Sequence, residues 1–112
     1  MNLLMKKLYI LIFSFLFSLS AFSQEGLQER AKNISNEMTM VLSLDDQTSE
    51  KIYHIQLKRF IEAQRIRKSN ANDKKQMRAE LRKLQNRLWG RLNSVLGEEK
   101  MKIWSSHKKK QV

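Results

Sequence analysis

The chain has no cysteine and no proline, and only 3 of its 112 residues are glycine. Without cysteine it can form neither disulfide bonds nor thiolate metal sites, and it cannot carry a lipid on a cysteine. Because proline and glycine most often interrupt helices, their scarcity favours long helices. Aromatic residues are also few, at 8%, and a chain of this length buries only a thin core. Such a chain gains stability when long helices pair or when two copies associate.

Long apolar runs are scarce too, and the single one, over residues 8–19, lies near the N-terminus. Two lysines precede this run, and Ala21 and Ser23 occupy the small-residue positions that signal peptidase reads. This layout is typical of a secretory signal peptide. We therefore expect residues 1–23 to be cleaved after Ser23, which leaves one domain over 24–112 in the periplasm. A spanning helix needs about 20 apolar residues, more than this segment offers, which disfavours an uncleaved anchor.

Acidic residues are half as numerous as basic ones, 11 against 22, which gives a net charge of +11. A strongly basic chain often binds nucleic acid, but export argues against nucleic acid as a partner. The anionic partners outside the cytoplasm are acidic or unfolded polypeptides and the head groups of anionic lipids. The alternative is that the charge only keeps helix surfaces solvated. We expect the basic tail over 107–110 to be frayed and solvated. Its positive charge also suggests an anionic lipid surface as a partner.

Apolar residues recur at helical spacing along most of the chain after residue 25. Steps of three and four residues predict helices over 26–42, 46–68 and 74–96, followed by a short fourth helix over 98–105. The second helix has a broad apolar face. It contacts either a second subunit or ligand besides its hairpin partner, or it is the central helix of a small bundle. The predicted class is all-α, with a long antiparallel hairpin flanked by shorter helices.

Polar residues mark the expected helix ends. Asp45 or Asp46 can cap the second helix, Asp73 can cap the third, and Gly97 is a typical residue at which a helix ends. Trp89 lies about 100° from the apolar seam of the third helix. This offset favours a contact with a flanking helix over an exposed binding platform.

The sequence contains no pattern that is typical of an enzyme. There is no nucleophile elbow, no glycine-rich phosphate loop and no metalloprotease motif. The two histidines, His54 and His107, lie on different predicted helices, and neither has another histidine or a cysteine at metal-ligand spacing. Lys51 and Lys58 flank His54 and would repel a cation. We therefore predict a protein that is not an enzyme and uses no cofactor, and the sequence offers no metal site.

Two segments resemble the signatures of the LTxxQ-motif family of periplasmic proteins, the Spy/CpxP-like proteins. The first segment runs from Leu42 to Tyr53 and the second from Val95 to Trp104. The positions that correspond to the leucine, threonine and glutamine of the family pattern are Leu44, Asp45 and Thr48 in the first segment and Leu96, Gly97 and Lys100 in the second.

This resemblance implies a four-helix protein that forms cradle-shaped homodimers. It further implies an ATP-independent chaperone for unfolded or acidic clients, or an adaptor that restrains an envelope-stress sensor protein. The alternative is a metal- or stress-sensing regulatory protein of the periplasm, because similar folds include metal-resistance sensors.

A concave face that mixes arginine and apolar side chains would suit the first of these functions. Long-range attraction would draw in acidic segments, and apolar contacts would then hold them loosely. The predicted client-binding residues are Arg59, Arg65, Arg82 and Arg91 for charged contacts and Phe60, Ile61 and Trp89 for apolar contacts.

Overall fold

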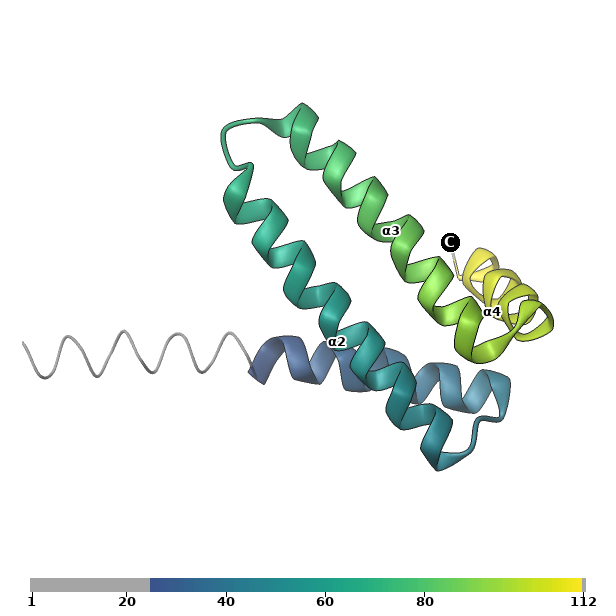
Figure 1. Cartoon of the computed structure of the whole chain (residues 1–112). Coiled ribbons are helices and arrows are strands. Elements are labelled where there is room, and N and C mark those ends of the chain that lie inside the picture. The colour runs from purple at the N-terminus through teal and green to yellow at the C-terminus, as the bar shows by residue number, and fades with distance from the viewer. Residues whose placement is uncertain (1–24, 112) are drawn as a thin grey trace, which may run out of the picture.

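The computed structural model describes residues 25–111, and within this range the chain forms four helices and no strand. They span residues 25–42 (called helix 25–42 below), Asp46–Ser69 (α2), Lys74–Leu96 (α3) and Glu98–Lys110 (α4) (Figure 1). The predicted all-α class is confirmed. The predicted signal peptide over 1–23 lies outside the described residues. No helix within 25–111 is both long enough and apolar enough to cross a membrane.

Aspartates cap both helices of the hairpin, as the sequence predicts. The Asp45 carboxylate accepts a hydrogen bond from the backbone N–H of Thr48 at 2.7 Å, and the Asp73 carboxylate accepts one from that of Gln76 at 3.0 Å. These bonds satisfy donors that have no partner within the helix. Gly97 separates α3 from α4 with a φ of 83°, a left-handed conformation that glycine adopts without strain. Asp45, Asp73 and Gly97, which lie between the apolar stripes, therefore mark the helix boundaries.

The fourth helix is longer than the sequence predicts, because α4 continues to Lys110 instead of ending near Ser105. Its first turn is acidic and its last turn is basic, which is the polarity that the helix dipole favours. The prediction of a frayed tail over 107–110 is therefore wrong, whereas solvent exposure holds for Lys109 and Lys110 and not for His107 and Lys108, which are half-buried. Side chains of this segment contact helix 25–42, and these contacts hold the last turns of α4 in place.

The long helices α2 and α3 lie side by side and run in opposite directions (Figure 1). Helix 25–42 crosses α2, and α4 folds back beside the C-terminal part of α3 (Figure 1). The two shorter helices therefore gather at one end of the hairpin, away from the turn that joins α2 to α3.

The main hydrophobic core lies at this crowded end, where all four helices contribute side chains. Its buried members are Met38, Leu42, Leu44, Ile52, Leu88, Leu92, Met101 and Trp104. A smaller cluster of Ala63, Ile66 and Leu84 holds the half of the hairpin nearer the turn. Most of the apolar burial that stabilises the fold is thus concentrated at one end.

Helix α2 contacts other helices on two of its sides. The buried Gln56 side chain contacts Met38 of helix 25–42. On another side of α2, Glu62 lies 3.7 Å from Arg87 and 3.6 Å from Arg91 of α3. These contacts fit the central helix of a small bundle, but Ile61 of the apolar face is 50% exposed, and contact of this face with a second subunit or ligand stays a prediction.

Candidate functional site

The structure does not bring the seven predicted client-binding residues onto one surface. Phe60 lies against helix 25–42, because Arg30 of that helix lies over its ring, and Arg59 lies over the same ring. Ile61 and Arg65 are exposed on α2. The remaining three residues lie on α3, where Arg82 and Trp89 are exposed and Arg91 is half-buried beside Glu62.

Phe60 lies beneath two arginine side chains. Its ring is 4.4 Å from the Arg30 guanidinium carbon and 4.7 Å from that of Arg59, and the residue is 8% exposed. Both distances fall within the range of a cation–π contact. Arg30 was not predicted from the sequence, because it lies beside the apolar stripe of helix 25–42 and only the crossing of the helices brings it to Phe60.

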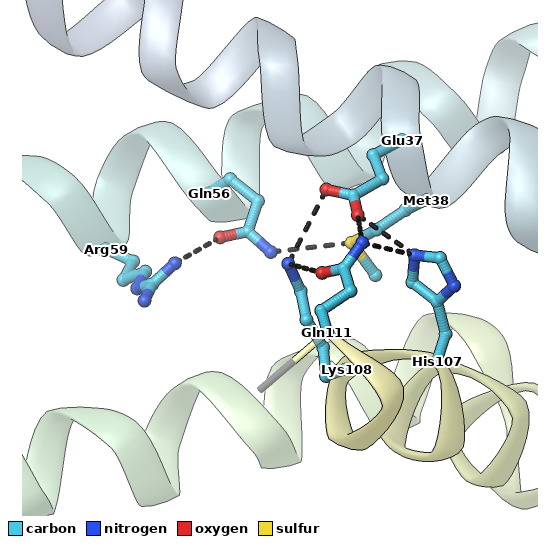
Figure 2. A network of polar contacts seen from close by, with 7 residues as sticks. All are labelled: Glu37, Met38, Gln56, Arg59, His107, Lys108 and Gln111. Carbon is cyan, nitrogen blue, oxygen red and sulfur yellow. Dashed lines mark hydrogen bonds and ion pairs between the residues drawn. The ribbon is translucent and has the colours of Figure 1, made fainter.

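A buried glutamine orients Arg59. The Gln56 side chain is 1% exposed. Its oxygen accepts a hydrogen bond from Arg59 Nη1 at 3.1 Å, and its nitrogen donates to the Met38 sulfur at 3.5 Å (Figure 2). Burial lowers the pKa of Arg59, and the charges of Arg30 and Arg67 lower it further. Positive charge is therefore concentrated around Phe60.

Two open grooves run between helix 25–42 and α2 on this side of the hairpin. One has a volume of about 390 Å³ and is lined by the three cations Arg30, Arg67 and Lys68 together with Phe60 and other side chains. The other has a volume of about 250 Å³, and no charged residue lines it; Leu57 and Ile61 lie there with Gln28. Both grooves share Leu27 and Gln64 in their linings, so the basic groove adjoins the uncharged one.

A second polar cluster joins α4 to helix 25–42. The Glu37 carboxylate accepts hydrogen bonds from His107 at 3.0 Å, from Gln111 at 2.9 Å and from Lys108 at 3.5 Å (Figure 2). Hydrogen bonds from Gln111 and His107 are the main reasons why the pKa of Glu37 lies below its ordinary value. His107 also stacks on Trp104, with ring centroids 5.5 Å apart. The cluster therefore fastens the end of α4 to helix 25–42.

The two motif segments lie close together. Hydrogen bonds from the side chain and the backbone of Thr48 lower the pKa of Asp45. The nearby charge of Lys100 lowers this pKa further. Leu44 of the first segment lies in the main core, and so do Met101 and Trp104 of the second. Leu96 packs against the same core, and Gly97 caps α4 without a side-chain hydrogen bond. Both segments thus begin a helix at the crowded end of the molecule.

Trp89 lies next to α4 and is not covered by it. It is 45% exposed and lines a hollow of about 440 Å³ together with residues of α4 such as Met101 and Lys102. The predicted contact of Trp89 with a flanking helix stays a prediction, since the side chain shares this hollow with α4 but nearly half of it is open to solvent.

No group of three or more potential metal ligands occurs among residues 25–111. His54 is exposed and lies 3.9 Å from Glu50, one turn earlier on the same helix. Comparison of the chain with models of known protein families, with curated proteins and with solved structures finds no match. The resemblance to the LTxxQ-motif family accordingly stays a prediction.

Proposed function

We propose that this chain is a non-enzymatic binding protein of the periplasm that holds unfolded or acidic segments of other proteins. It would act as an ATP-independent chaperone or as an adaptor of an envelope-stress sensor. The observation that carries the proposal is the exposure of large apolar side chains beside arginines on the hairpin. Ile61 is 50% exposed and Trp89 is 45% exposed, and the arginines Arg65 and Arg82 are exposed on the same two helices.

Charge and apolar contact would contribute to binding in different ways. Exposed arginines attract acidic segments over a distance of about one Debye length, ~10 Å at moderate salt. Exposed apolar side chains then gain about 25 cal/mol for each Å² of apolar surface that they cover. Because these side chains are separated on the surface, each contact is small, and binding to an unfolded segment is loose and reversible.

The proposal includes membership of the LTxxQ-motif family and a homodimer. In support, both motif segments begin helices and meet at the crowded end of the fold. The thin core, concentrated at that end, is of the kind that association of two copies would extend. Sedimentation of the mature chain at several concentrations tests the dimer, and a monomer at all concentrations would contradict it.

A light-scattering assay with an aggregating acidic client tests the chaperone function. We expect stoichiometric protein at low salt to suppress aggregation, and we expect the double variant Arg65→Gln, Arg82→Gln to suppress it less. Lys109→Gln with Lys110→Gln is the matched control, since it removes the same charge from exposed positions on α4. Trp89→Ser tests the apolar part. The chaperone proposal would be contradicted by an absence of suppression, or by equal losses in the two double variants.

A further inference from the structure

Arg59 and Phe60 have surroundings that differ from those of the other predicted client-binding residues. The Phe60 ring lies beneath the guanidinium groups of Arg30 and Arg59, and Arg67 is close enough to influence the charge of Arg59. A cation over an aromatic ring is common in proteins, but two such cations around one ring repel each other. Their convergence therefore costs free energy unless an anion is bound.

The described residues 25–111 supply no such anion. Within residues 25–111, no carboxylate lies within 4 Å of the guanidinium groups of Arg30, Arg59 or Arg67. By contrast, Arg87 and Arg91 both face Glu62. Arg67 and Lys68 also stand in the last turn of α2, where the helix dipole favours cations. The dipole does not account for Arg30, which lies on a different helix.

The two grooves beside this cluster share Leu27 and Gln64 and together form one groove with two parts. Arg30, Arg67 and Lys68 line its basic part, of about 390 Å³. The adjoining part, of about 250 Å³, has no charged residue in its lining, where Leu57 and Ile61 lie with Gln28. Arg59 does not line the groove and contributes only its charge, held in place by Gln56.

We propose that this groove binds a phosphomonoester group that carries an apolar tail, with the phosphoryl oxygens on Arg30, Arg67 and Lys68 and the tail against Leu57 and Ile61. Guanidinium groups bind phosphoryl oxygens in a bidentate manner. A phosphomonoester brings a charge of about −1.5 to −2 in one compact group, whereas a carboxylate brings −1. A single phosphomonoester therefore compensates the convergent cations better than one acidic side chain does. This inference is independent of the proposed chaperone function.

Nuclear magnetic resonance titration of the full mature chain tests the site with three probes: inorganic phosphate, a short-chain phosphatidic acid and a phosphatidylcholine of the same chain length. We expect phosphate and phosphatidic acid to shift the amide signals around Arg30, Phe60 and Arg67. Phosphatidic acid alone should also shift those around Leu57 and Ile61. Tighter binding of phosphatidic acid than of phosphate would support a phosphorylated lipid as the ligand, and equal binding would show that the tail contributes nothing and would overturn the proposal.

The variant Arg30→Gln, Arg67→Gln should weaken binding of phosphatidic acid about tenfold or more, because it removes hydrogen bonds to a charged group. The matched control is Arg78→Gln with Arg82→Gln, exposed residues of α3 that do not line the groove. It should bind as the parent chain does. Circular dichroism of both variants confirms that they fold.

Three other results would overturn the proposal. In the first, the control variant loses as much affinity as the groove variant, which would show attraction by net charge alone. In the second, phosphate and phosphatidic acid shift no signal in the groove. In the third, phosphatidylcholine binds as tightly as phosphatidic acid. An acidic peptide that shifts the groove signals where phosphate does not would assign the groove to protein clients instead.

Discussion

The contact between Glu37 and the end of α4 gives a prediction that pH and mutation can test together. Glu37 accepts hydrogen bonds from His107 at 3.0 Å and from Gln111 at 2.9 Å, and Lys108 lies at 3.5 Å. Hydrogen bonds to charged groups contribute about 1.5–3 kcal/mol each when shielded, but exposed ion pairs contribute less than about 1 kcal/mol. The Glu37 side chain is 30% exposed. We therefore expect Glu37→Gln to lower the free energy of unfolding by about 1 kcal/mol at neutral pH.

The pH dependence follows from the lowered pKa of Glu37. Because hydrogen bonds from Gln111 and His107 hold the folded-state pKa below the ordinary value of 4.5, the carboxylate stabilises the fold when it is ionised. The contribution is complete above pH 4.5 and is lost as the pH falls through the folded-state pKa. Below that pKa the parent chain carries a neutral carboxylic acid, which resembles the glutamine of the variant, so the difference between the two proteins should vanish.

Urea unfolding, followed by circular dichroism at a series of pH values from neutral to acidic, measures this difference. The matched control is Glu29→Gln, an exposed residue of helix 25–42 that belongs to none of the ion pairs found within residues 25–111. It removes the same charge and should change stability little. A loss in Glu37→Gln that is the same at acidic and neutral pH would refute the electrostatic reasoning. A loss equal to that of the control would refute the specific contact.

Other predictions concern the core, the helix cap, metal binding and the processing site. Leu92→Ala in the main core should cost about 3–5 kcal/mol in urea unfolding, and Leu84→Ala in the smaller cluster about 2 kcal/mol, because fewer buried side chains surround it; equal losses would contradict the uneven core. Asp45→Ala should destabilise the start of α2 and speed amide exchange there, whereas Asp46→Ala should not, since Asp45 makes the capping bond. Calorimetric titration with copper, zinc or nickel should show no binding tighter than the micromolar range, and tight stoichiometric binding would instead favour the metal-sensing alternative. Mass spectrometry of the exported protein should find a chain that begins at Gln24, whereas an intact Met1 would contradict the predicted signal peptide.

Much of the fold could be predicted because the relevant signals are local. The apolar spacing of the third helix and its flanking residues, Asp73 and Gly97, predict the bounds that α3 has in the structure. The end of α4 could not be predicted in this way. The basic residues after Ser106 look like a solvated tail in sequence, and they remain helical because His107 and Lys108 reach Glu37, which lies about 70 residues earlier.

The candidate site was predicted less well than the fold, for a related reason. The seven predicted client-binding residues share only their types, arginine or apolar, and lie on two helices, α2 and α3. The structure places them in different surroundings. Phe60 contacts Arg30, and Arg91 lies beside Glu62. Ile61 and Trp89 are exposed on different helices. Helical spacing predicts the side of its own helix on which a residue lies, but not the side chain that another helix places opposite it.

The sequence by itself determined the all-α class, the positions of the long helices and their caps, because these depend on residues within a few positions of one another. Only the tertiary structure decided which charges are paired and, within residues 25–111, which cations converge without an acidic partner. Because helix 25–42 crosses α2, Arg30 lies over the Phe60 ring. Because α4 packs beside helix 25–42, His107 contacts Glu37. These contacts depend on the packing of side chains distant in sequence, and packing is settled by the shape of the shared core rather than by any local pattern.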